Sequence, residues 1–171
     1  MNTTAFPDIF VDQDDVLAEF YGTAGAILGA PFQSLSPAVR WGRLERVPRL
    51  FRHLPVRPDA LALWHGLEGR GNRSILTAMP RPTGLLHTAA ADKVEWAREH
   101  ITPTAPVIVA ESGLAKAAWA RPGAVLIDNL QRNIDVWVAA GGLGIVHTSA
   151  ADTLAQLDAL GLRQQASVTR A

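Results

Sequence analysis

The sequence predicts an α/β protein in which a doubly wound, Rossmann-like parallel sheet carries a small helical cap inserted after the first strand. Three observations predict this fold. Short apolar runs rich in branched residues recur along the chain, segments with helical spacing lie between them, and one interval rich in glycine and proline breaks the alternation. Strands that alternate with helices form parallel βαβ units, with helices on both faces of the sheet.

Five apolar runs are the predicted strands. They are short and almost free of charge, which is typical of strands buried on both faces of a sheet. They comprise residues 9–11, 74–77, 107–109, 125–127 and 144–146.

Four segments between these runs have helical spacing and helix-start signals. They comprise residues 59–67, 92–101, 133–140 and 149–160. Pro58 precedes the first of them, and Ser149 is the predicted N-cap of the last.

The interval 19–58 carries repeated glycine and proline and is predicted to form short helices. We therefore divide the chain into a core, residues 1–18 and 59–171, and a cap, residues 19–58. In open parallel sheets, ligands bind beyond the carboxyl ends of the strands. A cap that leaves the end of the first strand would lie over that site. The polar segment 163–171 is predicted to fray.

Composition excludes several functional classes. The chain has 171 residues and a mass of 18.3 kDa, which suits one domain. Its 16 acidic and 16 basic residues cancel, so we expect neither a nucleic-acid polymer nor a membrane surface as partner. The absence of cysteine excludes disulfides, thiolate metal sites and a cysteine nucleophile. We expect a cytoplasmic monomer or homodimer.

The basic residues are unevenly chosen. All but two of the 16 are arginines, and the two lysines are Lys93 and Lys116. A composition that favours arginine wherever a generic positive charge suffices points to these two positions as ones that need a compact ammonium group.

Polar residues follow three of the predicted strands, and a lysine precedes one. They are Asp12, Gln13, Asp14 and Asp15 after the first strand, Thr77 and Ala78 after the second, Lys116 before the fourth, and Asp128 and Asn129 after it. Taken singly, they fit a solvated acidic turn, a strand-end cap, a surface lysine and an Asx-turn. Together, three acids and an amide at one sheet edge would repel unless a cation lay among them. Oxygen ligands without cysteine or paired histidines favour Mg²⁺.

At this point the sequence resembles the haloacid-dehalogenase superfamily of aspartyl phosphotransferases. The run from Ile9 to Val16, a hydrophobic strand followed by Asp-Gln-Asp-Asp-Val, is similar to that superfamily's first motif. Further segments resemble its 5′(3′)-deoxyribonucleotidase branch, also called the 5′-nucleotidase C-type family. They are residues 14–20, 54–60, 75–78, 93–96 and 125–137. These motifs occur in the family's order and span nearly the whole chain.

The resemblance implies roles for individual residues. Asp12 would be the nucleophile that forms an aspartyl-phosphate, and Asp14 the general acid and base. Thr77, the amide of Ala78 and Lys116 would hold phosphate oxygens, with Gln13 and Lys93 as further phosphate or substrate ligands. Mg²⁺ would be held by Asp12, the backbone carbonyl of Asp14, and Asp128 or Asn129.

The sequence departs from the family branch at two positions. Asn129 stands where the branch commonly has a second aspartate, which removes a negative charge from the implied metal site. Asp15 stands where the branch often has glycine, and the sequence gives no physical reason for this carboxylate.

The predicted cap combines arginines with aromatic side chains. Arginines recur every third residue from Arg40 to Arg52. The candidates for stacking on a flat base are Phe20, Tyr21, Trp41 and Phe51. The alternative is a solvated helix face over an apolar underside. Because a three-residue step drifts around a helix of 3.6 residues per turn, we expect most of these arginines to face away from the site.

These features together predict a Mg²⁺-dependent phosphomonoesterase acting on nucleoside or deoxynucleoside monophosphates. One alternative is a phosphatase for another small phosphate ester, such as a sugar phosphate. An alternative from a different class is a non-catalytic module of the same fold that binds a phosphorylated ligand.

Overall fold

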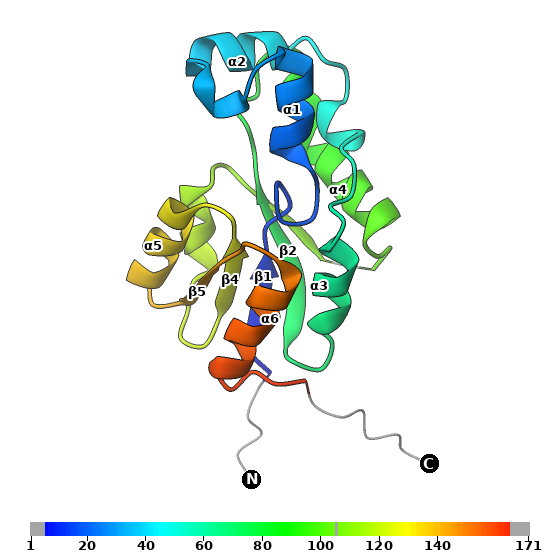
Figure 1. Cartoon of the computed structure of the whole chain (residues 1–171). Helices are drawn as coiled ribbons and strands as arrows, with labels where there is room; N and C mark the ends of the chain where they lie inside the picture. Colours follow the sequence, from blue (N-terminus) through cyan, green and yellow to red (C-terminus); the bar gives the residue numbers. More distant parts are fainter. Residues whose placement is uncertain (1–5, 105, 165–171) are drawn as a thin grey trace.

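The central feature of the computed structural model is a five-stranded parallel sheet (Figure 1). The structure describes residues 6–104 and 106–164. Its strands are β1 (Asp8–Val11), β2 (Asn72–Ala78), β3 (Val107–Ala110), β4 (Val125–Asp128) and β5 (Leu143–Val146). They lie in the order β3-β2-β1-β4-β5, so β1 is central. All five predicted strands are confirmed, and so is the α/β fold class.

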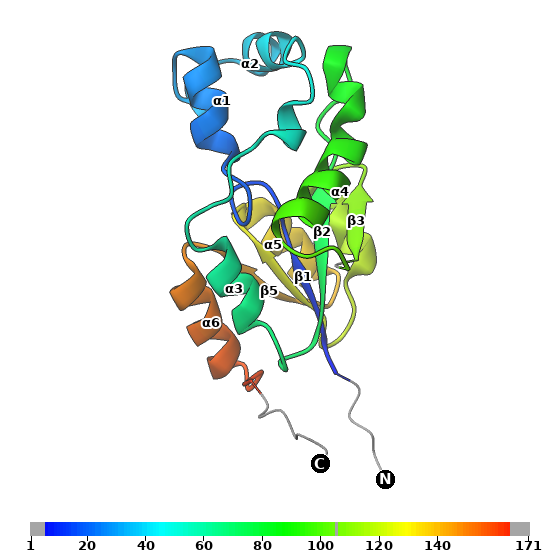
Figure 2. The ribbon, with the colours of Figure 1, turned by 90° about the vertical axis from the view of Figure 1, so that its right-hand side faces the viewer.

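Helices cover both faces of this sheet, as its alternating side chains require. Ile9 and Val11 of β1 pack in a cluster with α3 (Ala60–Gly66), α4 (Ala89–His100) and α6 (Ala150–Ala159). Phe10, which points to the other face, packs with α5 (Gln131–Ala139). Figure 2 shows α3 and α6 side by side to the left of the strands and α5 behind the strands. The sheet is therefore doubly wound.

The four predicted helices are confirmed, with shifted starts. The segment predicted to begin at Asp92 begins at Ala89, because three alanines extend the helix without any capping side chain to mark its start. The segment predicted to begin at Asn133 begins at Gln131. Ser149 is the N-cap of α6, and its hydroxyl accepts a hydrogen bond from the Asp152 N–H, as predicted.

The glycine- and proline-rich interval forms short helices, as expected. They are α1 (Phe20–Leu28), the 3₁₀ helix η1 (Phe32–Ser34), α2 (Pro37–Leu44) and the 3₁₀ helix η2 (Leu50–Arg52). Ser36 caps α2, and Pro37 occupies the first helical position, where its missing N–H costs no hydrogen bond. Figure 1 shows α1 and α2 beyond the carboxyl ends of the strands.

Ion pairs join the cap, residues 19–58 and called the capping segment from here on, to α4. The Arg49 guanidinium contacts both Asp92 and Glu95 at 2.7 Å, and Arg52 pairs with Glu95 and Glu99. The indole N–H of Trp96 also donates to the carbonyl of Leu54 at 2.7 Å. These contacts hold η2 against α4.

No helix in residues 6–104 and 106–164 combines the length and the apolar character needed to cross a membrane. Most of the polar segment that was predicted to fray, residues 165–171, lies outside the described residues.

A buried histidine makes the fold sensitive to acid. His147 follows β5, and its Nδ1 lies 2.8 Å from the Thr153 hydroxyl. Burial lowers the pKa of His147 below its usual value of 6.5, and Asp59 opposes this shift. Because the unfolded chain takes up the proton first, the free energy of unfolding should fall as the pH drops below about 6.5, by at most about 1.4 kcal/mol per pH unit.

Chemical denaturation between pH 7.5 and pH 5.5 measures this effect. The His147→Asn variant keeps a group near Nδ1 that can contact Thr153 but cannot be protonated. We expect the variant to lose less stability on acidification than the wild type. An identical pH dependence in both proteins would contradict a role for His147.

Candidate active site

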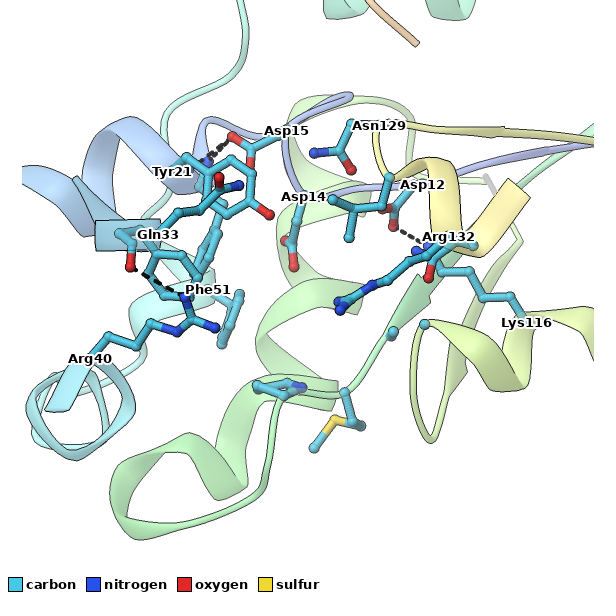
Figure 3. Close-up of a pocket in the computed structure, with 18 of the residues that line it drawn as sticks. Asp12, Asp14, Asp15, Tyr21, Gln33, Arg40, Phe51, Lys116, Asn129 and Arg132 are labelled. Carbon is cyan, nitrogen blue, oxygen red and sulfur yellow. Dashed lines mark hydrogen bonds and ion pairs between the residues drawn. The ribbon is translucent and has the colours of Figure 1, made fainter. Parts of the chain in front are cut away.

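Three strand ends meet beneath the capping segment and line a pocket of about 520 Å³ (Figure 3). Asp12 follows β1, Ala78 ends β2, and Asn129 follows β4. The chain crosses from β1 to β2 in one direction and reaches β4 in the other, so the switch point of the sheet lies between β1 and β4. Open α/β sheets bind ligands at such a point.

The Asp12 carboxylate is held by two donors on one oxygen. Its Oδ1 accepts hydrogen bonds from the backbone N–H of Gln13 and from the Lys116 ammonium, both at 2.7 Å. The Asp12 backbone N–H donates to the carbonyl of Ile127 on β4 at 2.9 Å. The side chain is only 8% exposed, yet it lines the pocket. The other carboxylate oxygen has no such partner among the described residues.

Lys116 forms ion pairs with two buried carboxylates. It lies on the 3₁₀ helix η4 (Leu114–Trp119), and its ammonium contacts Asp12 and Asp128 at 2.7 Å each. Burial works against the charged ammonium, but these two carboxylates outweigh it and raise the pKa of Lys116. Burial also raises the pKa of Asp12 to about 7, although Lys116 opposes that shift.

The structure separates the roles of Asp128 and Asn129. The Asp128 carboxylate accepts hydrogen bonds from Lys116, the Leu130 N–H at 2.9 Å, and the Asn133 amide at 3.0 and 3.1 Å. It is fully buried and does not line the pocket. Asn129 lines the pocket, and its buried Oδ1 has no hydrogen-bond partner among the described residues.

Lys93 holds Asp14 in a similar way. Its ammonium contacts Asp14 Oδ2 at 2.5 Å and the Thr77 hydroxyl at 3.0 Å, and it lies 4.5 Å from the centre of the Phe51 ring. Asp14 Oδ1 has no partner among the described residues, and the carboxylate lines the pocket. Both lysines of the chain are thus buried beside carboxylates at this site.

Repulsion among these acids therefore does not by itself require a metal ion. Asp12 and Asp128 share Lys116, and Asp14 pairs with Lys93, so the fold itself supplies two cations to three carboxylates.

Two predicted substrate ligands lie elsewhere. The Gln13 side chain is fully buried, does not line the pocket and donates to the Lys93 carbonyl at 3.3 Å, so its place in the structure does not support the predicted role of substrate ligand. The backbone of Gln13 is fixed by a tight loop, because its carbonyl accepts the N–H groups of Val16, Leu17 and Ala18. This backbone position directs the Gln13 side chain away from the pocket. Thr77 is also fully buried behind the pocket lining, and its hydroxyl faces Lys93, whereas its neighbour Ala78 does line the pocket.

The structure gives Asp15 a local role. Its carboxylate accepts the backbone N–H groups of Phe20 and Tyr21, at 3.1 and 2.9 Å, and so caps the first turn of α1. Its φ of 57° lies in the left-handed region, which aspartate tolerates better than most residues. Burial raises the pKa of Asp15 to about 6, while the Tyr21 hydrogen bond opposes the shift. Asp15 thus joins the loop after β1 to the capping segment.

The four aromatic candidates all line the pocket, with unequal exposure. Phe20 and Phe51 are buried and stack on each other at 5.6 Å, whereas Tyr21 and Trp41 are half-buried. Of the five arginines between positions 40 and 52, only Arg40 lines the pocket.

Other lining residues carry no sequence signal that marks them. Phe32, Gln33, Met79 and Arg132 reach the pocket only through the tertiary fold. Arg132 lies at the start of α5, four residues after Asp128. This position after a strand end is the one sequence feature that could have indicated Arg132 as a pocket residue.

Oxygen ligands for Mg²⁺ remain at this site. Among the described residues, no three His, Cys, Asp or Glu side chains form a metal-binding group. The available set is instead the Asp12 carboxylate, the partnerless Oδ1 of Asn129 and a backbone carbonyl such as that of Asp14. Carboxylate, amide and carbonyl oxygens suit this hard cation. The residues therefore fit Mg²⁺, although Asn129 leaves the site with one negative charge fewer than a second aspartate would give.

Comparison with known proteins identifies the fold. No protein-family model matches the sequence, and no curated protein matches it. Among solved structures, the chain is similar to a hydrolase from Streptococcus pneumoniae TIGR4, with a TM-score of 0.52 and 14% identity. The match covers 91% of this chain and 100% of the pneumococcal chain. At that identity, the likeness shows a shared α/β fold.

Proposed function

We propose that the protein is a hydrolase that removes phosphate from small phosphomonoesters, with nucleoside or deoxynucleoside monophosphates as its preferred class. The observation that carries the proposal is the state of Asp12. One oxygen is fixed by Lys116 and the Gln13 N–H, while the other is free at the edge of a pocket beside Asp14. The structural similarity to a protein called a hydrolase agrees with it.

Two steps account for the reaction. The free oxygen of Asp12 attacks phosphorus and forms an aspartyl-phosphate, and the bond from phosphorus to the ester oxygen breaks. Asp14 gives a proton to that departing oxygen. Asp14 then takes a proton from the water that cleaves the aspartyl-phosphate, which releases inorganic phosphate and restores Asp12.

Two fixed charges support this chemistry. Lys116 keeps positive charge beside the attacking carboxylate, where negative charge gathers on the phosphoryl oxygens. Lys93 orients Asp14 through Oδ2 and leaves Oδ1 available for proton transfer. Mg²⁺, when held by Asp12, Asn129 and the Asp14 carbonyl, would add charge neutralisation at the phosphate and favour the ionised form of Asp12.

A substrate panel tests the proposal. Phosphate release is measured from nucleoside monophosphates, sugar phosphates and aryl phosphates, each with Mg²⁺ and with a chelator. We expect turnover that needs Mg²⁺ and is fastest with nucleotides. Faster turnover of sugar phosphates would replace the nucleotidase assignment. Ligand binding without turnover of any ester would leave only a phospho-ligand-binding module.

A single substitution tests the metal ligand. Asn129→Asp restores a second carboxylate, so the Mg²⁺ concentration for half-maximal activity should fall about tenfold, as about 1.4 kcal/mol of added attraction would give. Thermal unfolding at increasing Mg²⁺ gives a readout that does not depend on turnover. Gln131→Glu is the matched control, because it adds the same charge at another lining position. An equal response of both variants would mean that Asn129 is not a ligand.

A further inference from the structure

The wall of the pocket formed by the capping segment holds an arginine with unused hydrogen-bonding capacity. Arg40 lies on α2, its guanidinium sits 4.4 Å from the centre of the Phe32 ring, and its Nη1 donates to the Phe32 carbonyl at 3.4 Å. Its Nε is buried and has no partner among the described residues. A buried donor left without an acceptor is costly, so this group is suited to a ligand.

Other arginines of the capping segment pair with acids, most of which lie on α4. Arg49, Arg52 and Arg57 each contact Asp or Glu side chains. Arg40 has no carboxylate within ion-pair distance in the part of the chain that the structure describes. Its cation therefore faces the pocket without a protein counter-charge.

A second arginine faces Arg40 across the pocket. Arg132 comes from the first turn of α5, on the core side, and forms no ion pair with the described residues. Figure 3 shows the Arg40 and Arg132 side chains extending toward one another from opposite sides, with Asp14 between their walls. The half-buried rings of Tyr21 and Trp41 line the same pocket.

We propose that the substrate of this site carries a second anionic group, held by Arg40, at the opposite end of the substrate from the phosphate that Asp12 accepts. The inference rests on the proposed function. The transferred phosphate must lie against Asp12 and Lys116, at the end of β1. Arg40 belongs to the opposite wall, so the anion it holds is a different one (Figure 3).

The chemistry of arginine selects the class of group. A planar guanidinium binds carboxylate or phosphate oxygens through paired, charge-assisted hydrogen bonds. The second anion is thus a carboxylate or a second phosphate, as in a phosphorylated aromatic acid or a nucleoside bisphosphate. A pocket of about 520 Å³ falls within the range of sites that enclose such small molecules.

Matched probes measure the effect. One pair is phenyl phosphate and 4-carboxyphenyl phosphate, and the other is adenosine 5′-monophosphate and adenosine 3′,5′-bisphosphate. In the wild type, at fixed Mg²⁺, we expect kcat/KM to be about 10- to 100-fold higher for the acid-bearing member of at least one pair. The pair that shows the preference identifies carboxylate or phosphate as the second anion.

Substitutions test whether Arg40 causes the preference for the acid-bearing probe. Arg40→Gln should abolish it, and Arg40→Lys, which keeps the charge but loses the planar fork, should retain part of it. The control is Arg46→Gln, since Arg46 is exposed in the same segment and does not line the pocket. Equal kcat/KM within both pairs, or a preference that survives Arg40→Gln, would overturn the inference while leaving the phosphatase assignment intact.

Binding separates the two proposals. Calorimetric titration of the Asp12→Asn protein with the same probes requires no turnover. If no probe is hydrolysed by the wild type but the acid-bearing members bind about tenfold more tightly, the proposed reaction fails and the Arg40 site stands. If the members of each pair bind equally, the Arg40 site fails whatever the reaction.

Discussion

Replacement of Asp12 by asparagine should lower kcat by at least about 10⁴-fold, the scale seen when an enzyme loses its nucleophile. The amide oxygen can still accept hydrogen bonds from Lys116 and the Gln13 N–H, so the shape of the site is preserved. What is lost is the charged oxygen that attacks phosphorus. Because burial opposes ionisation of Asp12, loss of this charge should alter the free energy of unfolding by no more than about 1 kcal/mol.

The control for this substitution is Asp8→Asn. Asp8 begins the same strand that Asp12 follows, but it lies at the opposite end and pairs with Arg121 on the surface. Phosphate release and chemical denaturation should show full activity for Asp8→Asn and a folded, inactive Asp12→Asn. Turnover near the wild-type rate in Asp12→Asn would refute the assigned nucleophile.

The sheet and the edge where the site lies could be predicted because both follow from short-range pattern. An apolar run such as 125–127 is stable only where other elements cover both faces of its strand, and the structure buries it in this way. Parallel strands then bring their carboxyl ends to one edge of the sheet. Asp12 and Asn129 therefore reach one pocket although 117 positions separate them in the sequence. The register of β1 with β4 fixes both positions.

The direction of individual side chains could not be predicted in this way. Gln13 and Asp14 are neighbours in sequence, but one points to the Lys93 carbonyl and the other into the pocket. Asp128 and Asn129 divide similarly, because Asp128 is drawn to the buried ammonium of Lys116. These choices depend on charges contributed by η4 and α4, which no local pattern places.

The choice of lysine was informative where spacing was not. Lys93 and Lys116 are both fully or almost fully buried, with exposed fractions of 0% and 1%, and each contacts an acid of the site. A buried ammonium is tolerated only when it is paired. In a chain that otherwise uses arginine, the two lysines therefore mark the two places where a compact cation must fit between packed carboxylates.

Loss of the Lys116 charge should destabilise the fold more than any other substitution at the site. Lys116→Met leaves the carboxylates of Asp12 and Asp128 buried without a cation, and breaking a buried pair in this way costs about 3–5 kcal/mol. Chemical denaturation at pH 8 should show that loss, and phosphate release should be abolished with it. Lys93→Met should cost less, because its partner Asp14 is 26% exposed and water can replace the ammonium.

A second substitution distinguishes lost charge from lost packing. Adding Asp128→Asn to Lys116→Met removes one of the two stranded charges, while the amide still fills the same space. The double variant should therefore recover part of the stability lost by Lys116→Met, and the coupling energy between the two positions should be favourable in a double-mutant cycle. A guanidinium is larger than the ammonium that contacts Asp12 and Asp128 at 2.7 Å each, so Lys116→Arg should also lower the free energy of unfolding. Additive losses in the double variant would show that Lys116 acts by packing alone.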